Sequence, residues 1–121
     1  MRRQRDPHPA TPAVKPVDLY VLLALRGGAR HGYGLVRDVE EQSGGRLRLA
    51  PASLYNVLQR LLDWGWIEED ADEESEDPSF SGGPPRRAYL LSELGHSVLD
   101  AERVRLREVL GLLDSRPDGT R

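Results

Sequence analysis

Polar side chains recur on one side of the segment 51–64, between leucines that point the other way in a helix. Asn and Gln amides form paired hydrogen bonds with adenine edges, and an arginine guanidinium does so with guanine or with a phosphate. A small side chain such as Ala52 lets a helix approach the bases closely. This chemistry suits a helix that reads the major groove of DNA, and the candidate contact residues are Ser53, Tyr55, Asn56, Gln59 and Arg60.

A second set of candidates lies outside this segment. Arg86 and Arg87 follow the Gly-, Pro- and Ser-rich stretch 79–85, so a flexible loop brings their guanidinium groups within reach of phosphates. Tyr33 stands at the start of another predicted helix, where its hydroxyl can touch a phosphate. Core packing of the Tyr33 ring is an equally favoured alternative, and Tyr89 is expected in the core of a strand.

Few residues are arranged for catalysis or for metal binding. The chain has no cysteine, three histidines without paired spacing, no Gly-x-Ser-x-Gly motif and no phosphate-binding glycine-rich loop. Ser53 has no general base near it in the sequence, and His31 is expected to help start a helix rather than to bind a metal or sense protons. We therefore expect no enzymatic activity, no cofactor and no metal.

Charge is unevenly distributed along the 121 residues, whose formal net charge is −3. Eight acidic residues and no basic one lie within 68–77, whereas residues 1–67 hold ten Lys or Arg against six Asp or Glu. The chain outside this acidic block is mildly basic, which suits a DNA-binding surface. The block lacks the Asp-x-Asp-x-Asp-Gly spacing of a calcium loop, and we interpret it as a solvated charge run.

The sequence contains no candidate membrane span or export signal. The longest apolar run, 19–25, is far shorter than the roughly 20 residues that a spanning helix needs. Prolines follow the N-terminal arginines, where a signal peptide has an apolar stretch. Residues 1–16, rich in Pro and Arg, and residues 115–121 are expected to be disordered tails. These features predict a cytoplasmic protein without membrane contact.

Hydrophobic spacing predicts three helices before the acidic block, over about 17–26, 33–43 and 51–64. Asp18 falls in the first turn of the first helix, where negative charge is favourable. Glycine pairs at 27–28 and 44–45 end the first two helices. The third helix carries a single apolar stripe made of Leu54, Leu58, Leu61 and Leu62.

Two strands and a long helix follow. The strands begin at Trp66 and Arg87 and enclose a wing tip over 68–85. Ser92 is the expected N-cap of a helix over 93–114, and Gly95 is expected to weaken its first turn. This helix has more apolar surface than a small domain needs, so we expect it to form a dimer. The expected dimer interface consists of Leu19, Leu99, Leu106, Val109, Leu110 and Leu113.

The order of these elements predicts an α+β, mainly α fold. It is a winged helix-turn-helix of three helices and a two-stranded wing over 17–92, with a C-terminal dimerisation helix. A two-fold dimer would place two reading helices about 34–36 Å apart, facing an inverted-repeat operator on double-stranded DNA. The alternative is a winged helix that binds a protein partner through the acidic block and has no specific DNA target.

From residue 17 to about residue 101 the chain resembles the PadR-type transcriptional regulators. The matching motifs are LLAL at 22–25, HGYGL at 31–35, SGG at 43–45, ASLY at 52–55, GWI at 65–67, GP at 83–84, RRAY at 86–89 and LSELG at 91–95. The resemblance implies a winged helix-turn-helix, dimerisation through the C-terminal helix, and repression of transcription that is often released by a small-molecule effector.

The chain also departs from this family pattern. Asn56 stands where the family often has proline, which leaves a backbone donor and adds a side chain able to read bases. A single helix follows the wing, as in the shorter subgroup of the family. Trp64 and Trp66 are candidates for a slot that stacks a planar effector, and ordinary core packing at the helix–strand junction is the favoured alternative.

Overall fold

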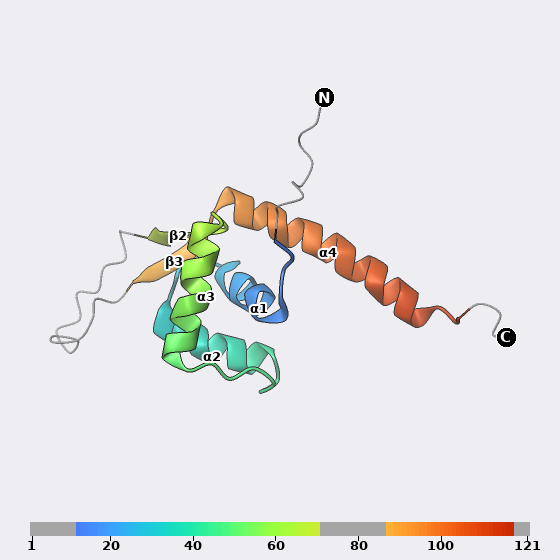
Figure 1. The fold of residues 1–121 in the computed structure, drawn as a ribbon, viewed down its shortest axis with the longest axis horizontal. Helices are drawn as coiled ribbons and strands as arrows, with labels where there is room; N and C mark the ends of the chain where they lie inside the picture. The colour runs from blue at the N-terminus through green and yellow to red at the C-terminus, as the bar shows by residue number, and fades with distance from the viewer. Residues whose placement is uncertain (1–11, 71–86, 118–121) are drawn as a thin grey trace, which may run out of the picture.

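The computed structural model describes residues 12–70 and 87–117, which form four helices and a small sheet (Figure 1). The predicted wing tip beyond residue 70, Arg86 and the outer parts of both predicted tails lie outside the described residues. In chain order the elements are α1 (Pro16–Leu25), β1 (Arg30–His31), α2 (Gly32–Gln42), α3 (Pro51–Asp63), β2 (Ile67–Asp70), β3 (Ala88–Leu91) and α4 (Glu93–Asp114). This is the predicted α+β, mainly α winged-helix order.

α1 is apolar on most sides because it lies between the other elements. The helices α2, α3 and α4 and the strand β3 all pack against it. Its residues Val21, Leu22 and Leu25 are completely or almost completely buried. A helix that is apolar all round is stable only in such a position, where several neighbours remove its side chains from water.

The predicted leucine stripe of α3 faces the core. Leu54, Leu58 and Leu61 are buried, Val57 joins them, and Leu62 is half-buried. These side chains pack with the apolar side of α2 and with the buried residues of α1. Because the stripe follows the helical period, its burial leaves the remaining residues of α3 facing solvent.

The sheet has three antiparallel strands in the order β1–β3–β2, one more than predicted. β2 and β3 are the two predicted wing strands, with Ile67 opposite Leu91 and Asp70 opposite Ala88. The additional strand β1 spans only Arg30–His31, too short to produce an alternating pattern in the sequence. It forms because the chain entering α2 lies beside β3, so that Gly32 N donates to Arg87 O at 3.3 Å.

Ser92 caps α4 as predicted and also ties this helix to the end of α3. Its Oγ accepts a hydrogen bond from Gly95 N at 2.9 Å and donates one to Gly65 O at 2.6 Å. α4 then runs along α1, and its C-terminal half extends away from the body of the protein (Figure 1). The capped end of α4 is therefore fixed, whereas none of the other described elements packs against its far end.

Gly95 has a packing role that the sequence alone does not reveal. The first turn of α4 approaches Trp66 so closely that a Cβ on Gly95 would lie 2.0 Å from the Trp66 carbonyl oxygen. The expectation that glycine simply weakens this turn is therefore incomplete. Glycine is required because backbone occupies the space that any side chain would need.

Substitution Gly95→Ala should lower the free energy of unfolding by about 2–3 kcal/mol, because the new methyl group can be accommodated only by moving backbone. Gly111→Ala is the matched control, since no atom of the described residues lies within 4 Å of a Cβ at that position of the same helix. Removing this exposed helical glycine should raise stability by about 0.5–1 kcal/mol. Urea denaturation at one fixed protein concentration measures both, and equal effects of the two substitutions would contradict the packing argument.

Candidate nucleic-acid interface

The N-terminal half of α3 presents small and polar side chains to solvent. Ala52 and Ser53 are exposed in the first turn, and Asn56 and Gln59 are exposed one and two turns later. Residue Ala50 occupies the N-cap position and offers no side-chain hydrogen bond to the first-turn N–H groups. Such N–H groups suit a phosphate oxygen, and the small side chains allow a close approach. Four of the five predicted α3 contacts therefore share one solvent-facing region: Ser53, Tyr55, Asn56 and Gln59.

The two candidate tyrosines are both accessible. Tyr33 is 70% exposed at the start of α2, so the core-packing alternative does not apply to it. Tyr55 is 47% exposed, and its hydroxyl lies over Gly32, where a Cβ would come within 3.2 Å of the Tyr55 oxygen. Gly32, the first glycine of the HGYGL motif, thus makes room for the Tyr55 ring, which lies across the junction between α3 and α2.

A groove separates α3 from the wing. It has a volume of about 400 Å³ and its lining includes Tyr55 and Gln59 of α3, Glu69 of β2, and Arg87 and Tyr89 at β3. Burial raises the pKa of the Tyr89 hydroxyl, and the nearby Tyr55 and Glu69 raise it further. Tyr89 itself is in the core, as predicted. The groove therefore brings the predicted wing residue Arg87 together with the predicted α3 residues.

Two of these groove residues already bind carboxylates within the chain. Arg87 Nη1 lies 2.9 Å from Glu69 Oε2, and both side chains are about half exposed. Gln59 Nε2 donates to Asp63 Oδ1 at 3.1 Å, one turn further along α3. Both interactions are at the surface, where they contribute little to stability and can be exchanged for a DNA group.

Arg60 does not join the other candidates. Its guanidinium forms an ion pair with Asp18 of α1, whose side chain is completely buried, and it lies over the ring of Trp64 at 5.4 Å from the centroid. Asp18 also accepts a hydrogen bond from Lys15 N at 3.2 Å. Since a buried carboxylate needs its cation, Arg60 is committed to joining α3 to α1 and is unsuited to the DNA contact that the sequence suggested.

The sequence does contain a signal for this pair. Asp18 lies among Val17, Leu19 and Val21 in a helix that is apolar on most sides, which favours burial of its carboxylate. A buried acid requires a cation from another element. The sequence does not say which of the ten Lys or Arg residues before residue 68 supplies it.

The proposed tryptophan slot is closed. Trp66 is 2% exposed, and its ring contacts that of Trp64 with centroids 4.8 Å apart. This separation is within the range of about 4.5–7 Å for two aromatic rings in direct contact, so no planar ligand fits between them. Trp66 is packed in the core, as the favoured alternative predicted. The ring of the half-buried Trp64 instead lies against the guanidinium of Arg60.

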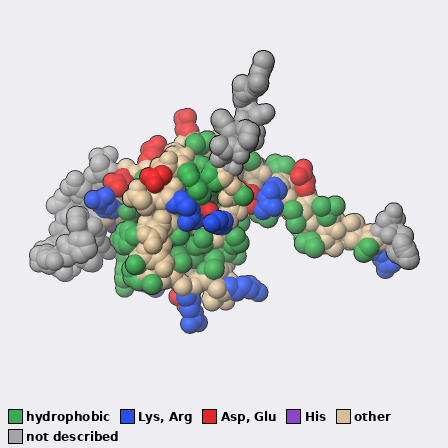
Figure 2. Space-filling view, viewed as in Figure 1, with side chains coloured by type: hydrophobic (Ala, Val, Ile, Leu, Met, Phe, Trp, Pro, Cys, Tyr) green, Lys and Arg blue, Asp and Glu red, His purple; other side chains and the backbone are tan. Residues whose placement is uncertain are grey.

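Basic residues that were not predicted as contacts lie on α2 and on the loop that leads into α3. Arg46 and Arg48 are exposed on the loop between α2 and α3, and Arg37 is exposed on α2. Figure 2 shows basic side chains projecting from the edge where Figure 1 places α2 and this loop. Arg48 approaches Glu40 at 3.4 Å, and Arg30 pairs with Asp38 at 2.6 Å. Scattered arginines form no sequence motif, which is why they were not predicted as contacts.

Histidine and acidic residues form no metal site in the part of the chain that the structure describes, where no three such side chains come together. His31 occupies the N-cap position of α2, without a side-chain cap hydrogen bond. Its Nε2 is enclosed and has no hydrogen-bond partner among the described residues. The helix-starting position that we predicted for His31 is thus observed, although its imidazole does not make the cap.

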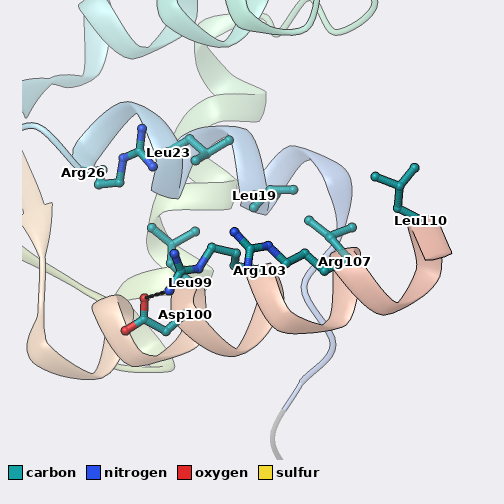
Figure 3. Close-up of a pocket in the computed structure, with 9 residues that line it drawn as sticks. Leu19, Leu23, Arg26, Leu99, Asp100, Arg103, Arg107 and Leu110 are labelled. Atoms are coloured by element: carbon teal, nitrogen blue, oxygen red, sulfur yellow. Dashed lines mark ion pairs between the residues drawn. The ribbon is translucent and has the colours of Figure 1, made fainter.

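A second groove runs between α1 and α4 on another part of the molecule (Figure 3). Leu19 and Leu23 of α1 face Leu99 and Leu110 of α4 across it, with arginines at its rim. Its volume is about 360 Å³. The lining contains four of the six predicted dimer residues, Leu19, Leu99, Leu106 and Leu110, whereas Val109 and Leu113 lie on α4 outside it.

The architecture defines a winged helix-turn-helix DNA-binding protein. Three helices precede a β-hairpin wing, and the third helix carries an exposed polar face next to that wing. Among the described residues, no helix has the length and apolar character needed to cross a bilayer.

Residues 21–101 match the Transcriptional regulator PadR-like family, and the chain belongs to this family of DNA-binding transcription regulators. No curated protein sequence matches the chain. The family resemblance seen in the sequence motifs is thus confirmed over about two thirds of the chain.

Solved structures share this fold at low sequence identity. A PadR family transcription regulator from Clostridium difficile is 20% identical with a TM-score of 0.65, and the match covers 83% of this chain and 96% of that one. A transcriptional regulator from Clostridium thermocellum is 17% identical with a TM-score of 0.64, covering 81% and 86% of the two chains. PadR of Bacillus subtilis, solved in complex with operator DNA, is 19% identical with a TM-score of 0.55, covering 85% of this chain and 50% of that one.

Substitution Arg60→Ala should lower the free energy of unfolding by about 2–4 kcal/mol, because it leaves the buried Asp18 carboxylate without its cation. Arg87→Ala is the matched control: it also removes an arginine from an ion pair, but at an exposed position where the loss should be at most about 1 kcal/mol. Thermal or urea unfolding followed by tryptophan fluorescence measures both. A wild-type stability for Arg60→Ala would return Arg60 to the list of DNA contacts.

Proposed function

We propose that this protein is a sequence-specific transcriptional repressor that binds an inverted-repeat operator as a homodimer in the cytoplasm. The observation that carries the proposal is the exposed face of α3, on which small and amide-bearing side chains are accessible to a duplex. The structural similarity to a PadR solved with its operator DNA supports the same use of the fold.

In this proposal α3 enters the major groove with its N-terminal half. Asn56 and Gln59 read base edges, for which their amides suit adenine, while Ser53 permits the close approach. Tyr33, Tyr55 and Arg87 contact phosphates on either side, because they flank the polar face of α3. The contact set that we propose adds Arg86, outside the described residues, and the loop arginines Arg46 and Arg48.

The groove between α1 and α4 is the surface that we assign to the dimer. Leu110, which lines this groove, and Leu112 and Leu113 beyond it are more than half exposed on α4. Figure 2 shows hydrophobic side chains along this projecting half of the helix. A second α4 lying antiparallel over Leu99, Leu106 and Leu110 would cover both features, and the two-fold axis would present two α3 helices to successive major grooves.

Repression follows if the dimer occupies a promoter, and a small-molecule effector would release it by favouring a different spacing of the two α3 helices. A ligand achieves this only if it binds one dimer geometry better than the other. The dimer groove is the candidate place for such a ligand, because α1 lies between it and α3.

A winged helix that binds a protein partner is the rival function. Most of the acidic block that would serve such a partner lies outside the described residues. The described part of the wing instead places Arg87 beside the polar residues of α3, an arrangement suited to a nucleic acid. The regulator is therefore the function that we favour.

The wild-type protein should bind a selected operator duplex at least a hundredfold more tightly than a random-sequence duplex, with affinity that falls steeply as salt rises. Asn56→Ala should weaken operator binding by about 1–3 kcal/mol and bind the random duplex unchanged, because it removes a base contact and no charge. Fluorescence anisotropy at two salt concentrations measures these affinities. Ser97→Ala, at an exposed position of α4, is the control. Equally weak binding of wild type to every genomic fragment would favour the protein-binding alternative.

Introducing charge at Leu106 or Leu110 should produce monomers, since a glutamate there would have to leave water and lie against the apolar side chains of the groove and of the partner. Val104→Glu is the matched control, because Val104 is 55% exposed on α4 and does not line the groove. Sedimentation velocity measures the oligomeric state. The monomeric variants should also bind the inverted repeat poorly. If Leu110→Glu remains dimeric, this groove is not the dimer interface.

A further inference from the structure

The wing arginine that faces the DNA-binding groove is held by a carboxylate of the neighbouring strand. Arg87 Nη1 and Glu69 Oε2 lie 2.9 Å apart, with about half of each side chain exposed. Glu69 is opposite Tyr89 in the β2–β3 ladder, and Arg87 precedes Tyr89 by two residues, so the side chains of Glu69 and Arg87 are on the same face and line the same groove. A surface ion pair of this kind contributes little to folding stability, so its place in the groove calls for another explanation.

The position of Glu69 is unfavourable for a protein that binds a polyanion. The groove around it is lined by Tyr55 and Gln59 of α3, which we assign to DNA contact. A phosphate that approaches Arg87 therefore meets a carboxylate already bound to that guanidinium. A phosphate that contacts Arg87 must displace the Glu69 carboxylate in addition to releasing counterions. The contact therefore contributes less free energy to DNA binding.

We propose that Glu69 limits the affinity of the wing for DNA: by competing with DNA phosphate for Arg87, it weakens binding to DNA of any sequence. The inference rests on the proposed DNA-binding function. Non-specific binding depends almost entirely on phosphate contacts, whereas operator binding also has base contacts from α3. Weakening one phosphate contact therefore lowers non-specific occupancy and leaves base discrimination intact.

The same pattern recurs elsewhere around α3. Arg30 pairs with Asp38 at 2.6 Å and Arg48 approaches Glu40 at 3.4 Å. Two of the three pairs take their carboxylate from α2 and the third takes it from β2, so the three are not the product of one helical repeat. Arg87–Glu69 is the pair to test, because it alone of the three lines the groove beside the α3 contact residues.

The test compares Glu69→Gln with Glu68→Gln in binding to a random-sequence duplex by fluorescence anisotropy. Glu68 is exposed on the same strand, lies opposite Leu90, and points to the other face of the sheet, so its substitution removes the same charge away from the groove. Glu69→Gln should tighten binding clearly more than Glu68→Gln. It should also steepen the slope of log affinity against log salt by about 0.9, the value for one additional phosphate contact.

The gain from Glu69→Gln should therefore be about three- to fourfold larger at 50 mM than at 200 mM salt. Affinity for an operator duplex selected with the wild-type protein should rise no more than affinity for the random duplex, so the specificity ratio does not improve. In an Arg87→Gln background the effect of Glu69→Gln should shrink to that of Glu68→Gln, because the guanidinium for which Glu69 and phosphate compete is no longer present.

Three results would overturn the inference and leave the proposed function standing. Equal effects of the two glutamate substitutions would show simple charge repulsion, as would a Glu69→Gln gain that persists without Arg87. A Glu69→Gln effect confined to duplexes that differ at one cytosine would make Glu69 a direct base reader. Wild-type protein that binds no duplex at all would instead remove the proposed function, and this inference with it.

Discussion

Burial of the apolar stripe of α3 is the constraint on which the rest of the structure depends. Leu54, Leu58 and Leu61 can be removed from water only by packing on α1 and α2, and each such side chain contributes about 1.5–3 kcal/mol when fully buried. The helical period then leaves Ser53, Asn56 and Gln59 outside. The surface that we assign to DNA is thus the geometric complement of the core, and a rotation of α3 would both expose leucine and bury amides.

Hydrophobic packing sets which side of α3 is buried, and the ion pair between Asp18 and Arg60 adds a specific point of attachment. Leucines tolerate small rotations and shifts against one another, whereas a buried carboxylate and its guanidinium must meet. Trp64 covers the guanidinium from the other side. Because α1 also forms one wall of the dimer groove, the same helix contacts both the proposed partner surface and the reading helix.

The overall charge of −3 is compatible with DNA binding because of where the charges lie and what they bind. Arginines gather around α3 and the wing, yet several are paired with carboxylates of their own chain. Such pairing lowers the positive potential that a duplex meets at a distance and keeps the guanidinium groups in place for close contact. In this arrangement, base contacts from α3 supply a larger share of the binding free energy, and non-specific phosphate attraction a smaller one, than in a uniformly basic protein.

The sequence determined a large part of this description. Periodic apolar residues and flanking Gly and Pro located every helix and both wing strands to within a few residues, since these signals are local. They also identified the polar face of α3, because leucines at helical spacing define the opposite face. The family motifs pointed to the same fold, and Ser92 was recognised as a cap from its position alone.

Interactions between distant segments were decided only by the tertiary structure. Arg60 looked like another polar residue of α3 until Asp18, 42 residues earlier, was found beside it. β1 is too short to have a pattern of its own and exists because β3 lies next to it. Gly95 looked like a weak helix residue until the Trp66 carbonyl occupied the space of its side chain. Sequence periodicity reports which residues avoid water, but partners far apart in the chain meet only when loops and helix packing bring them together, and no local pattern encodes that meeting.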